Sequence, residues 1–347
     1  MMNKENLKRL NGDPIDDNEL TNRIASLEAI VIHHKRFNDI LGSIKDCHLL
    51  QQKSPNKKGF CILGETGVGK STIFKIYEAS YPRTSGEKYI QNHFCEYKKI
   101  PILRVELASN SKPLNVASKM LEMLGDPLYW SGTEKVLTGR LKNYIIECEV
   151  ELVIIDELQH LIDTDTRNVI SKAADWLKQL LNDINLPIVF GGIIDKADRI
   201  FKANEQLDSR FPDKIKFLPF SYNSEDEIRE FRAFLKNIDR QLPLPESTNI
   251  YDPYMAEKIF YVTGGSPRIL NHLLYHSIIL ALREGKDTID ESHLQHGFEK
   301  IIINTRPMKN PFNGKALILS AALAELQKEL EKKDRQNRTG LFSQTSF

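Results

Sequence analysis

The chain has 347 residues, of which 41% are hydrophobic and 27% charged, and its formal net charge is +1. This composition is typical of a globular protein long enough for two domains, and the near-zero charge excludes nucleic-acid binding through an overall basic surface, so any DNA contact has to come from local patches. We find no apolar run that could span a bilayer, no apolar segment near the N-terminus and no C-x-x-C pair among the four cysteines, which predicts a cytoplasmic protein with reduced thiols, no membrane partner and no zinc site.

A glycine-rich segment follows the first apolar run, residues 60–63, and precedes an amphipathic stretch at residues 72–79. It matches the phosphate-binding loop pattern G-x-x-x-x-G-K-[ST], placed between a strand and a helix as that pattern requires. Backbone N–H groups and the helix N-terminus would surround a phosphate, Lys70 would reach the β- and γ-phosphates, and Ser71 would ligate Mg²⁺. A glycine-rich surface turn is the alternative, which the flanking elements disfavour. The predicted nucleotide contacts are Gly64, Glu65, Thr66, Gly67, Val68, Gly69, Lys70, Ser71 and Thr72.

A second motif, which is acidic, lies about 85 residues after the glycine-rich loop. After a predicted strand at 101–107 and helices at 113–124 and 133–148, four apolar residues are followed by Asp156 and Glu157. This pattern indicates a buried parallel strand that carries carboxylates to its C-terminal end, where ligands of open α/β sheets bind. We expect Asp156 to hold Mg²⁺ through water and Glu157 to orient and deprotonate the attacking water. The alternative is that both acids only cap the next helix.

The remaining strands and the helical C-terminal part complete the predicted fold. An amphipathic helix at 166–185, a strand at 186–192, a helix at 195–207 and a strand at 214–218 give a parallel five-stranded sheet. From the capping box Ser224-Glu-Asp-Glu227 onward only helices are predicted, and they form a small lid. The predicted lid helices cover residues 228–242, 253–262, 266–283 and 290–303.

Arg268 stands out in this lid because it lies in the first turn of a predicted helix, after Ser266 and Pro267. A cation there opposes the helix dipole, which favours a role facing a phosphate. The predicted organisation is α/β, with a flexible N-terminal segment at 1–29, a nucleotide-binding domain at 30–220, the helical lid at 221–305 and a partner-binding tail at 306–347.

The run from about residue 30 to 303 resembles the AAA+ superfamily of P-loop ATPases, and within it the TniB/TnsC family of transposition regulators, with MuB and IstB as more distant relatives. The resemblance implies a bacterial, ATP-dependent, DNA-binding homo-oligomer, a ring or a helical filament on double-stranded DNA, that links a target-selector protein to a transposase. The segments that carry it are Gly64-Glu-Thr-Gly-Val-Gly-Lys-Ser71, Leu124-Gly-Asp-Pro127, Ile155-Asp-Glu-Leu-Gln-His-Leu161, Leu207-Asp-Ser-Arg-Phe211 and Asn310-Pro-Phe312.

The resemblance also assigns roles to single residues. Arg210 follows a helix at the place where AAA+ subunits present an arginine finger to a neighbour's γ-phosphate, although an exposed helix-end arginine is the simpler alternative and Arg199 a weaker candidate. Arg268 matches the second sensor of AAA+ lids. A polar residue usually ends the fourth strand to contact the γ-phosphate, but Gly191 and Gly192 stand there in this chain, so the first sensor stays unassigned.

In TniB/TnsC-like filaments, the segments after the second strand and at the start of the following helix contact DNA. Here they carry Lys112, Lys119, Thr133 and Lys135. Such side chains would hold phosphates without selecting sequence. A solvated helix face accounts equally well for each lysine taken singly.

Other classes stay open at this stage. A STAND-like or secretion-type AAA+ ATPase would act on proteins without binding DNA. An origin-recognition-like initiator would need a C-terminal winged helix, for which the residues after 303 are too few and too polar. A P-loop metabolic kinase is disfavoured by the adjacent Asp156 and Glu157 and by the helical lid.

Overall fold

The computed structural model describes residues 7–301, 309–313, 323–326 and 328, except 56, 91–92, 110 and 163–165, and only the backbone of 88–90 and 93–96. The chain divides into two compact units. Residues 35–218 form the first, called here the α/β unit, and residues up to 34 together with those from 219 onward form the second, called the helical unit. None of the helices in these described ranges is both long and apolar enough to cross a membrane.

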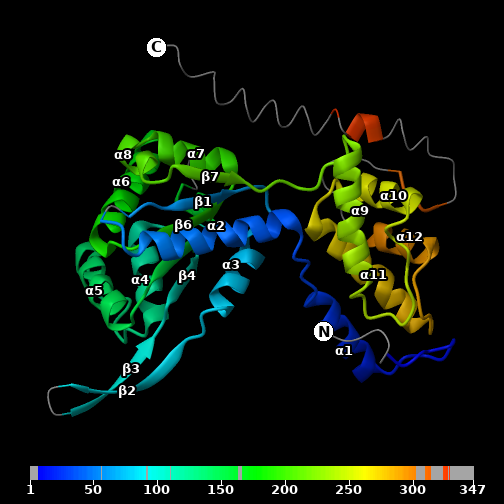
Figure 1. The fold of residues 1–347 in the computed structure, drawn as a ribbon, viewed down its shortest axis with the longest axis horizontal. Helices are drawn as coiled ribbons and strands as arrows, with labels where there is room; N and C mark the ends of the chain where they lie inside the picture. The colour runs from blue at the N-terminus through cyan, green and yellow to red at the C-terminus, as the bar shows by residue number, and fades with distance from the viewer. Residues whose placement is uncertain are drawn as a thin grey trace. The chain divides into compact units, whose positions relative to one another are not determined.

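The α/β unit is built on a five-stranded parallel sheet, as the sequence predicted, and its strand order is β4-β5-β6-β1-β7 (Figure 1). The three inner strands are buried along their whole length, because continuous apolar runs suit a sheet covered on both faces. In sheet order the strands are β4 (Ile102–Glu106), β5 (Leu152–Asp156), β6 (Ile188–Gly192), β1 (Phe60–Leu63) and β7 (Asp213–Lys216).

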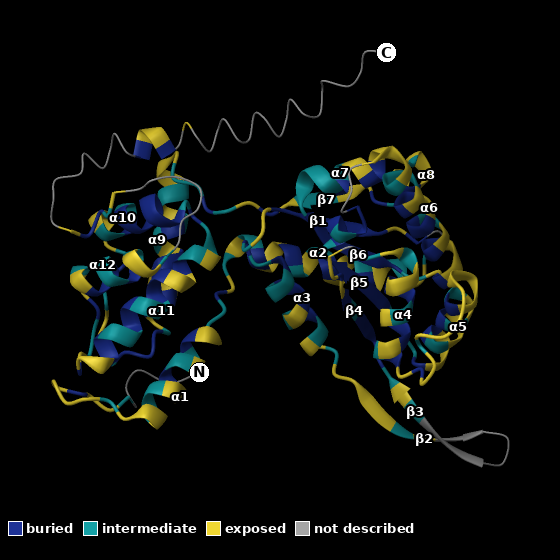
Figure 2. Cartoon of the chain, turned by 180° about the vertical axis from the view of Figure 1, so that it is seen from behind, coloured by how far each residue is buried: buried dark blue, intermediate teal, exposed yellow. Residues whose placement is uncertain are grey.

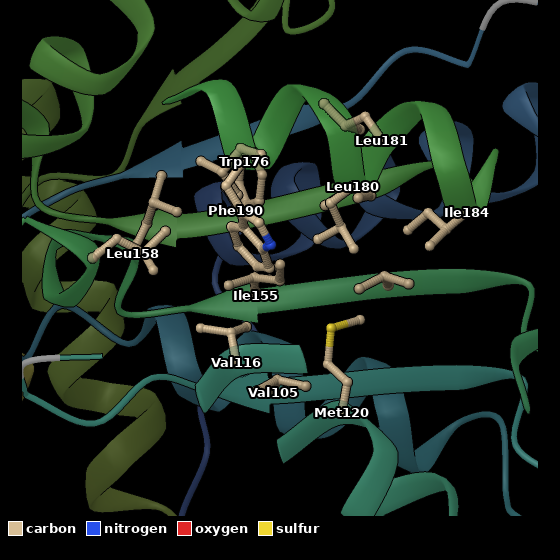
Figure 3. Close-up of a cluster of buried hydrophobic side chains, with 14 of the residues drawn as sticks. Val105, Val116, Met120, Ile155, Leu158, Trp176, Leu180, Leu181, Ile184 and Phe190 are labelled. Carbon is tan, nitrogen blue, oxygen red and sulfur yellow. The ribbon is translucent and has the colours of Figure 1, made fainter. Parts of the chain in front are cut away.

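Helix α6 packs on this sheet through one strongly apolar side. Trp176, Leu177 and Leu180 are buried against a core that includes Ile155 and Phe190 from the central strands (Figure 3). Deleting one such aliphatic side chain costs about 2 to 5 kcal/mol. The helices of this unit are α2 (Lys35–Gln51), α3 (Lys70–Ala79), α4 (Pro113–Leu124), α5 (Glu134–Glu147), the 3₁₀ turn η2 (Leu158–Leu161), α6 (Arg167–Ile184), α7 (Ile194–Lys202) and α8 (Glu205–Ser209).

Two features of the α/β unit differ from the sequence expectation. The helix expected at 195–207 is broken into α7 and α8, because the side chain of Asn204 accepts the N–H of Leu207 at 3.0 Å and starts a new helix. In addition, β2 (Thr84–Ile90) and β3 (His93–Lys99) form an antiparallel hairpin that extends away from the main sheet (Figure 1). The hairpin was not predicted from its sequence.

The helical unit has its own apolar core, to which its described helices contribute (Figure 2). The predicted capping box is present, since Ser224 accepts the N–H of Glu227 and the Glu227 carboxylate accepts the N–H of Ser224. Helices α11 and α12 approach closely at Gly297, where an added Cβ would lie 2.6 Å from the carbonyl oxygen of Leu273. The helices are α1 (Asp17–Glu28), α9 (Glu225–Asp239), α10 (Pro253–Thr263), α11 (Pro267–Arg283) and α12 (Glu291–Lys300).

Residues 7–28 and 309–313 lie in this unit in a way the sequence did not suggest. Residues 17–28, within the segment expected to be flexible, form α1, which packs against α11. The N–H of Leu10 donates to Asp287 Oδ1 at 2.8 Å, and the buried guanidinium of Arg23 donates to the carbonyl of Lys8 at 2.7 Å. Phe312 is buried in the same core. Most of the tail expected at 306–347 lies outside the described residues.

The junction between α10 and α11 generates a stability prediction. Gly264 and Gly265 both have positive φ, but a Cβ on Gly265 would lie 2.0 Å from the carbonyl oxygen of Phe220, whereas one on Gly264 would meet nothing within 4 Å. Gly264→Ala should cost only the backbone strain, roughly 1 to 2 kcal/mol. Gly265→Ala should lower the melting temperature of the helical unit by clearly more, because backbone also has to move. Equal melting temperatures of the two variants would contradict this packing.

Candidate nucleotide-binding site

The loop between β1 and α3 has a geometry that its glycines make possible. Gly67 and Gly69 have φ of 88° and 108°, which side-chain-bearing residues rarely adopt. A Cβ on Gly64 would lie 2.1 Å from the carbonyl oxygen of Phe217, so the loop passes directly over the residue that follows β7. Phe217 in turn donates its N–H to the carbonyl of Leu63 at 2.7 Å. The loop is therefore held in place by the neighbouring chain.

The predicted nucleotide contacts all lie on this loop or on the first turn of α3. Lys70 is buried, and its Nζ donates to the carbonyls of Gly64 and Glu65, both at 2.9 Å. Burial lowers the pKa of Lys70, while the nearby carboxylates of Glu157, Asp156 and Glu65 act in the opposite direction. The two hydrogen bonds place the Lys70 ammonium inside the loop. Val68 is buried, Glu65 and Thr66 are exposed, and Gly64, Gly67, Gly69, Ser71 and Thr72 are buried or half-buried.

Asp156 ends β5 with a fully buried carboxylate. Burial raises its pKa, opposed by a hydrogen bond with the Ser71 side chain and by the Glu157 N–H, which donates to Oδ1 at 2.9 Å. Among the residues that the structure describes, its Oδ2 finds no hydrogen-bond partner. A buried carboxylate oxygen left without a donor, beside a serine hydroxyl, fits the oxygen ligands that Mg²⁺ prefers. The two metal ligands predicted from the sequence therefore lie together.

Glu157 and Gln159 are joined side by side just after β5. Glu157 has a left-handed φ of 58°, which is strained for a residue with a side chain. The Gln159 amide nitrogen donates to Glu157 Oε2, and its amide oxygen accepts the N–H of Ile193 at 3.1 Å. From the sequence, Gln159 was expected only as part of the Ile155–Leu161 segment that carries the family resemblance, with an ordinary loop residue as the alternative.

Steric crowding explains why a glycine stands at position 191, at the end of β6. A Cβ on Gly191 would lie 2.6 Å from Asp156 Oδ1 and 2.4 Å from a ring carbon of Phe74. Any larger residue at 191 would push against the buried carboxylate or against α3. Position 191 therefore has no room for the polar side chain that the AAA+ resemblance led us to look for at the end of this strand.

Arg210 lies away from the phosphate loop of its own chain. Its Nη2 donates to Asn182 Oδ1 at 2.9 Å, and its carbonyl accepts the N–H of Gly59 at 2.7 Å. Gly59 precedes β1 and the loop follows β1, so Arg210 is at the opposite end of that strand. Arg199 is exposed on α7, and Arg268 is exposed in the first turn of α11 in the helical unit.

A cavity of about 470 Å³ lies near Arg210 rather than near the phosphate loop. It is lined by residues of α2, of the chain before β1 and of β7, and by none of the predicted nucleotide contacts. Cys47, one of its lining residues, has its pKa raised to about 12 by burial. The thiol is therefore protonated at neutral pH, which makes it a weak nucleophile.

The four predicted DNA contacts are exposed on two neighbouring helices. Lys112 and Thr133 are the N-cap residues of α4 and α5, and Lys119 and Lys135 lie on those helices. Lys119 forms an ion pair with Glu122 at 2.7 Å, which offsets its charge. Helices α4 and α5 pack against each other, so the four residues lie on adjacent elements of the unit.

The loop between α4 and α5 contains the Leu-Gly-Asp-Pro motif and is fixed by one arginine. Arg140 forms an ion pair with the buried Asp126 and donates to the carbonyls of Leu128 and Ser131. The loop presents Leu128 and Trp130 to solvent with 55% and 64% exposure, a feature that sequence reasoning missed.

These observations define the class of protein. The α/β unit has a phosphate loop after β1 and two adjacent acids at the end of β5, and the chain has a separate helical unit. These are the features of a P-loop ATPase of the AAA+ class. Residues 23–219 match the family described as bacterial TniB protein. The chain belongs to the TniB family.

Solved structures agree on the fold. The Aeropyrum pernix ORC2 protein in ADPNP-ADP complexes matches with a TM-score of 0.54 and 12% identity, over 80% of this chain and 70% of that chain. Cdc6p from Pyrobaculum aerophilum gives 0.56 and 14%, over 84% and 72%. The Aeropyrum pernix ORC1 protein in complex with DNA gives 0.51 and 13%, over 77% and 65%. A search of curated protein sequences found no match.

The loop geometry predicts the effect of removing its lysine. Lys70→Ala should weaken ATP binding at least about tenfold, because the variant loses the main cation for the β- and γ-phosphates. A titration with a fluorescent ATP analogue measures this. Lys75→Ala, which removes an exposed lysine from the same helix, is the matched control and should bind like the parent. Equal affinities of all three proteins would count against the loop as the phosphate site.

Proposed function

We propose that this protein is an ATP-dependent, DNA-binding regulator of DNA transposition in the bacterial cytoplasm. It would oligomerise as a ring or helical filament on double-stranded DNA and link a target-selector protein to a transposase. The family assignment supports this reading, and the observation that carries its ATP dependence is the cluster of Lys70, Ser71 and the unpaired Oδ2 of Asp156 beside Glu157.

In this proposal the protein's own groups divide the work of ATP hydrolysis. The loop N–H groups and Lys70 hold the phosphates, and Ser71 and Asp156 hold Mg²⁺, which neutralises charge on the phosphate oxygens when bound. Glu157 accepts a proton from the attacking water. The exposed Arg268 of α11 is proposed to contact the γ-phosphate as a second sensor.

Glu157→Gln tests the role of the base. The variant keeps the size of the side chain but cannot accept the proton, so ATP should bind normally while turnover falls at least about 100-fold. Phosphate release under saturating ATP and a binding titration separate the two effects. Turnover equal to that of the parent would assign the base to another group.

Arg210 is proposed to act on the neighbouring subunit. Its side chain is held by Asn182 and by the carbonyl of Lys57, at the end of β1 opposite to the phosphate loop. This position supports action in trans. An arginine supplied by a neighbour stabilises the charge that develops on the transferred phosphate. Hydrolysis would then depend on assembly.

Subunit mixing tests this arrangement. Arg210→Ala should bind ATP but lose hydrolysis, and Lys70→Ala should lose binding. A mixture of the two should regain part of the activity, since one interface type then pairs an intact loop with an intact arginine. Full activity of Arg210→Ala alone would reject the assignment and direct attention to Arg199.

DNA binding is proposed to use the surface formed by α4 and α5. Lys112, Lys135 and Thr133 are exposed there, and phosphate contacts from such residues hold DNA without selecting its sequence. One of the proteins with the same fold was solved in complex with DNA, which is consistent with this proposal. A nearly neutral chain can bind DNA strongly only when assembly aligns many such residues.

Salt dependence measures these contacts. Binding in the presence of ATP should be tolerant of sequence, and the logarithm of affinity should fall with the logarithm of salt concentration by about 0.9 per phosphate neutralised. Lys112→Ala should reduce that slope by about one. Lys172→Ala, on the exposed side of α6, is a matched control. If the protein with ATP retained no DNA on a filter at low salt, an ATPase acting on protein partners would become the better reading.

A further inference from the structure

Gln159 is a buried side chain beside the proposed base, and no nucleotide or metal contact described above uses it. It is 4% exposed and lies in η2, directly after Glu157 and Leu158. Both ends of its amide are engaged, one by Glu157 Oε2 and the other by the N–H of Ile193. Ile193 is the N-cap residue of α7, so one side chain connects the base to the start of that helix.

The orientation of this amide follows from the chemistry of its neighbours. The backbone N–H of Ile193 can only donate, so the atom that faces it at 3.1 Å has to be the amide oxygen. The NH₂ group then faces Glu157, whose ionised carboxylate can only accept. The two contacts support each other, and a flipped amide would place donor against donor.

Close packing limits the space for a second polar group at the end of the strand next to Gln159. A Cβ on Gly191 would meet Asp156 Oδ1 at 2.6 Å, and a Cβ on Gly192 would lie 3.4 Å from the Gln159 oxygen and 3.3 Å from Leu158 Cβ. The space at the end of β6 is thus filled by Gln159 itself, which comes from the neighbouring strand's connection rather than from β6.

We propose that Gln159 is a positioning residue for hydrolysis: it holds Glu157 Oε2, directs the other carboxylate oxygen toward the attacking water, and ties that orientation to the start of α7. The proposal rests on the proposed ATP hydrolysis with Glu157 as base. In that step the water proton moves to Glu157, the water oxygen bonds to the γ-phosphorus, and the bond from the γ-phosphorus to the bridging oxygen of ADP breaks. The products are ADP and phosphate.

The hydrogen bond between Gln159 and Ile193 also connects the base to helix α7. Helix α7 leads through Asn204 and α8 to Arg210, so the residue that orients the base is also attached to the segment proposed to reach the next subunit. A shift of that segment on assembly would pass through the Ile193 contact to Glu157.

Two substitutions distinguish the contributions of the two hydrogen bonds that the Gln159 amide makes. Gln159→Glu keeps an oxygen for the Ile193 N–H but replaces the donor to Glu157 with a second carboxylate, and Gln159→Met removes both contacts in a side chain of similar length. Both should lower kcat at least about tenfold and leave ATP affinity within about twofold of the parent. Gln179→Met, the same change on the exposed side of α6, should behave like the parent.

The separation of kcat from ATP affinity gives a result that a purely structural role would not produce, because a general loosening of the site would also weaken ATP binding. Equal losses in kcat and in ATP affinity would overturn positioning of the base.

A double-mutant cycle completes the test. If Gln159 acts only through Glu157, adding Gln159→Met to Glu157→Gln should reduce the residual rate less than about twofold. Losses that multiply would overturn the proposal, and so would a parental kcat in both Gln159 variants while Glu157→Gln is inactive. An active Glu157→Gln variant would instead reject the base of the proposed function. Should Gln159→Met fail to fold, Gln159→Glu decides, because it retains the Ile193 contact.

Discussion

The burial of one carboxylate, that of Asp156, organises the α/β unit. A charged group at the end of a fully buried strand is costly unless its neighbours compensate, and three elements are arranged around it: the Ser71 side chain from α3, the Glu157 N–H, and a strand end at Gly191 with no side chain. One oxygen remains without a donor. The sheet thereby pays a local cost in stability to keep a strong cation ligand beside the phosphate loop.

Local patterns were sufficient to predict the parts of the site that lie on one continuous segment. The loop from Gly64 to Ser71 and the acids after β5 are specified by residue type and spacing, and the structure places Ser71 and Asp156 in contact. The parallel order of the sheet was likewise predictable, because long apolar runs alternate with amphipathic helices. The roles of Arg210 and Arg268 stay predictions, because they depend on a second subunit and on bound nucleotide.

Other parts depend on contacts between segments far apart in sequence, and no local pattern announces them. Gln159 has a role only because Ile193, 34 residues away, donates to it. The position of Leu10 is set by Asp287, which is 277 residues further along the chain. The hairpin formed by β2 and β3 escaped prediction because its described residues show no apolar face of the kind that marks a buried strand.

The division of the chain has a consequence for how the protein folds during synthesis. The helical unit is assembled from two stretches of sequence separated by the whole α/β unit, residues 35–218. As the chain leaves the ribosome, the α/β unit can complete its sheet before α11, the helix that α1 packs against, has been synthesised. The helical unit therefore completes its core late, through contacts with a high entropic cost of loop closure.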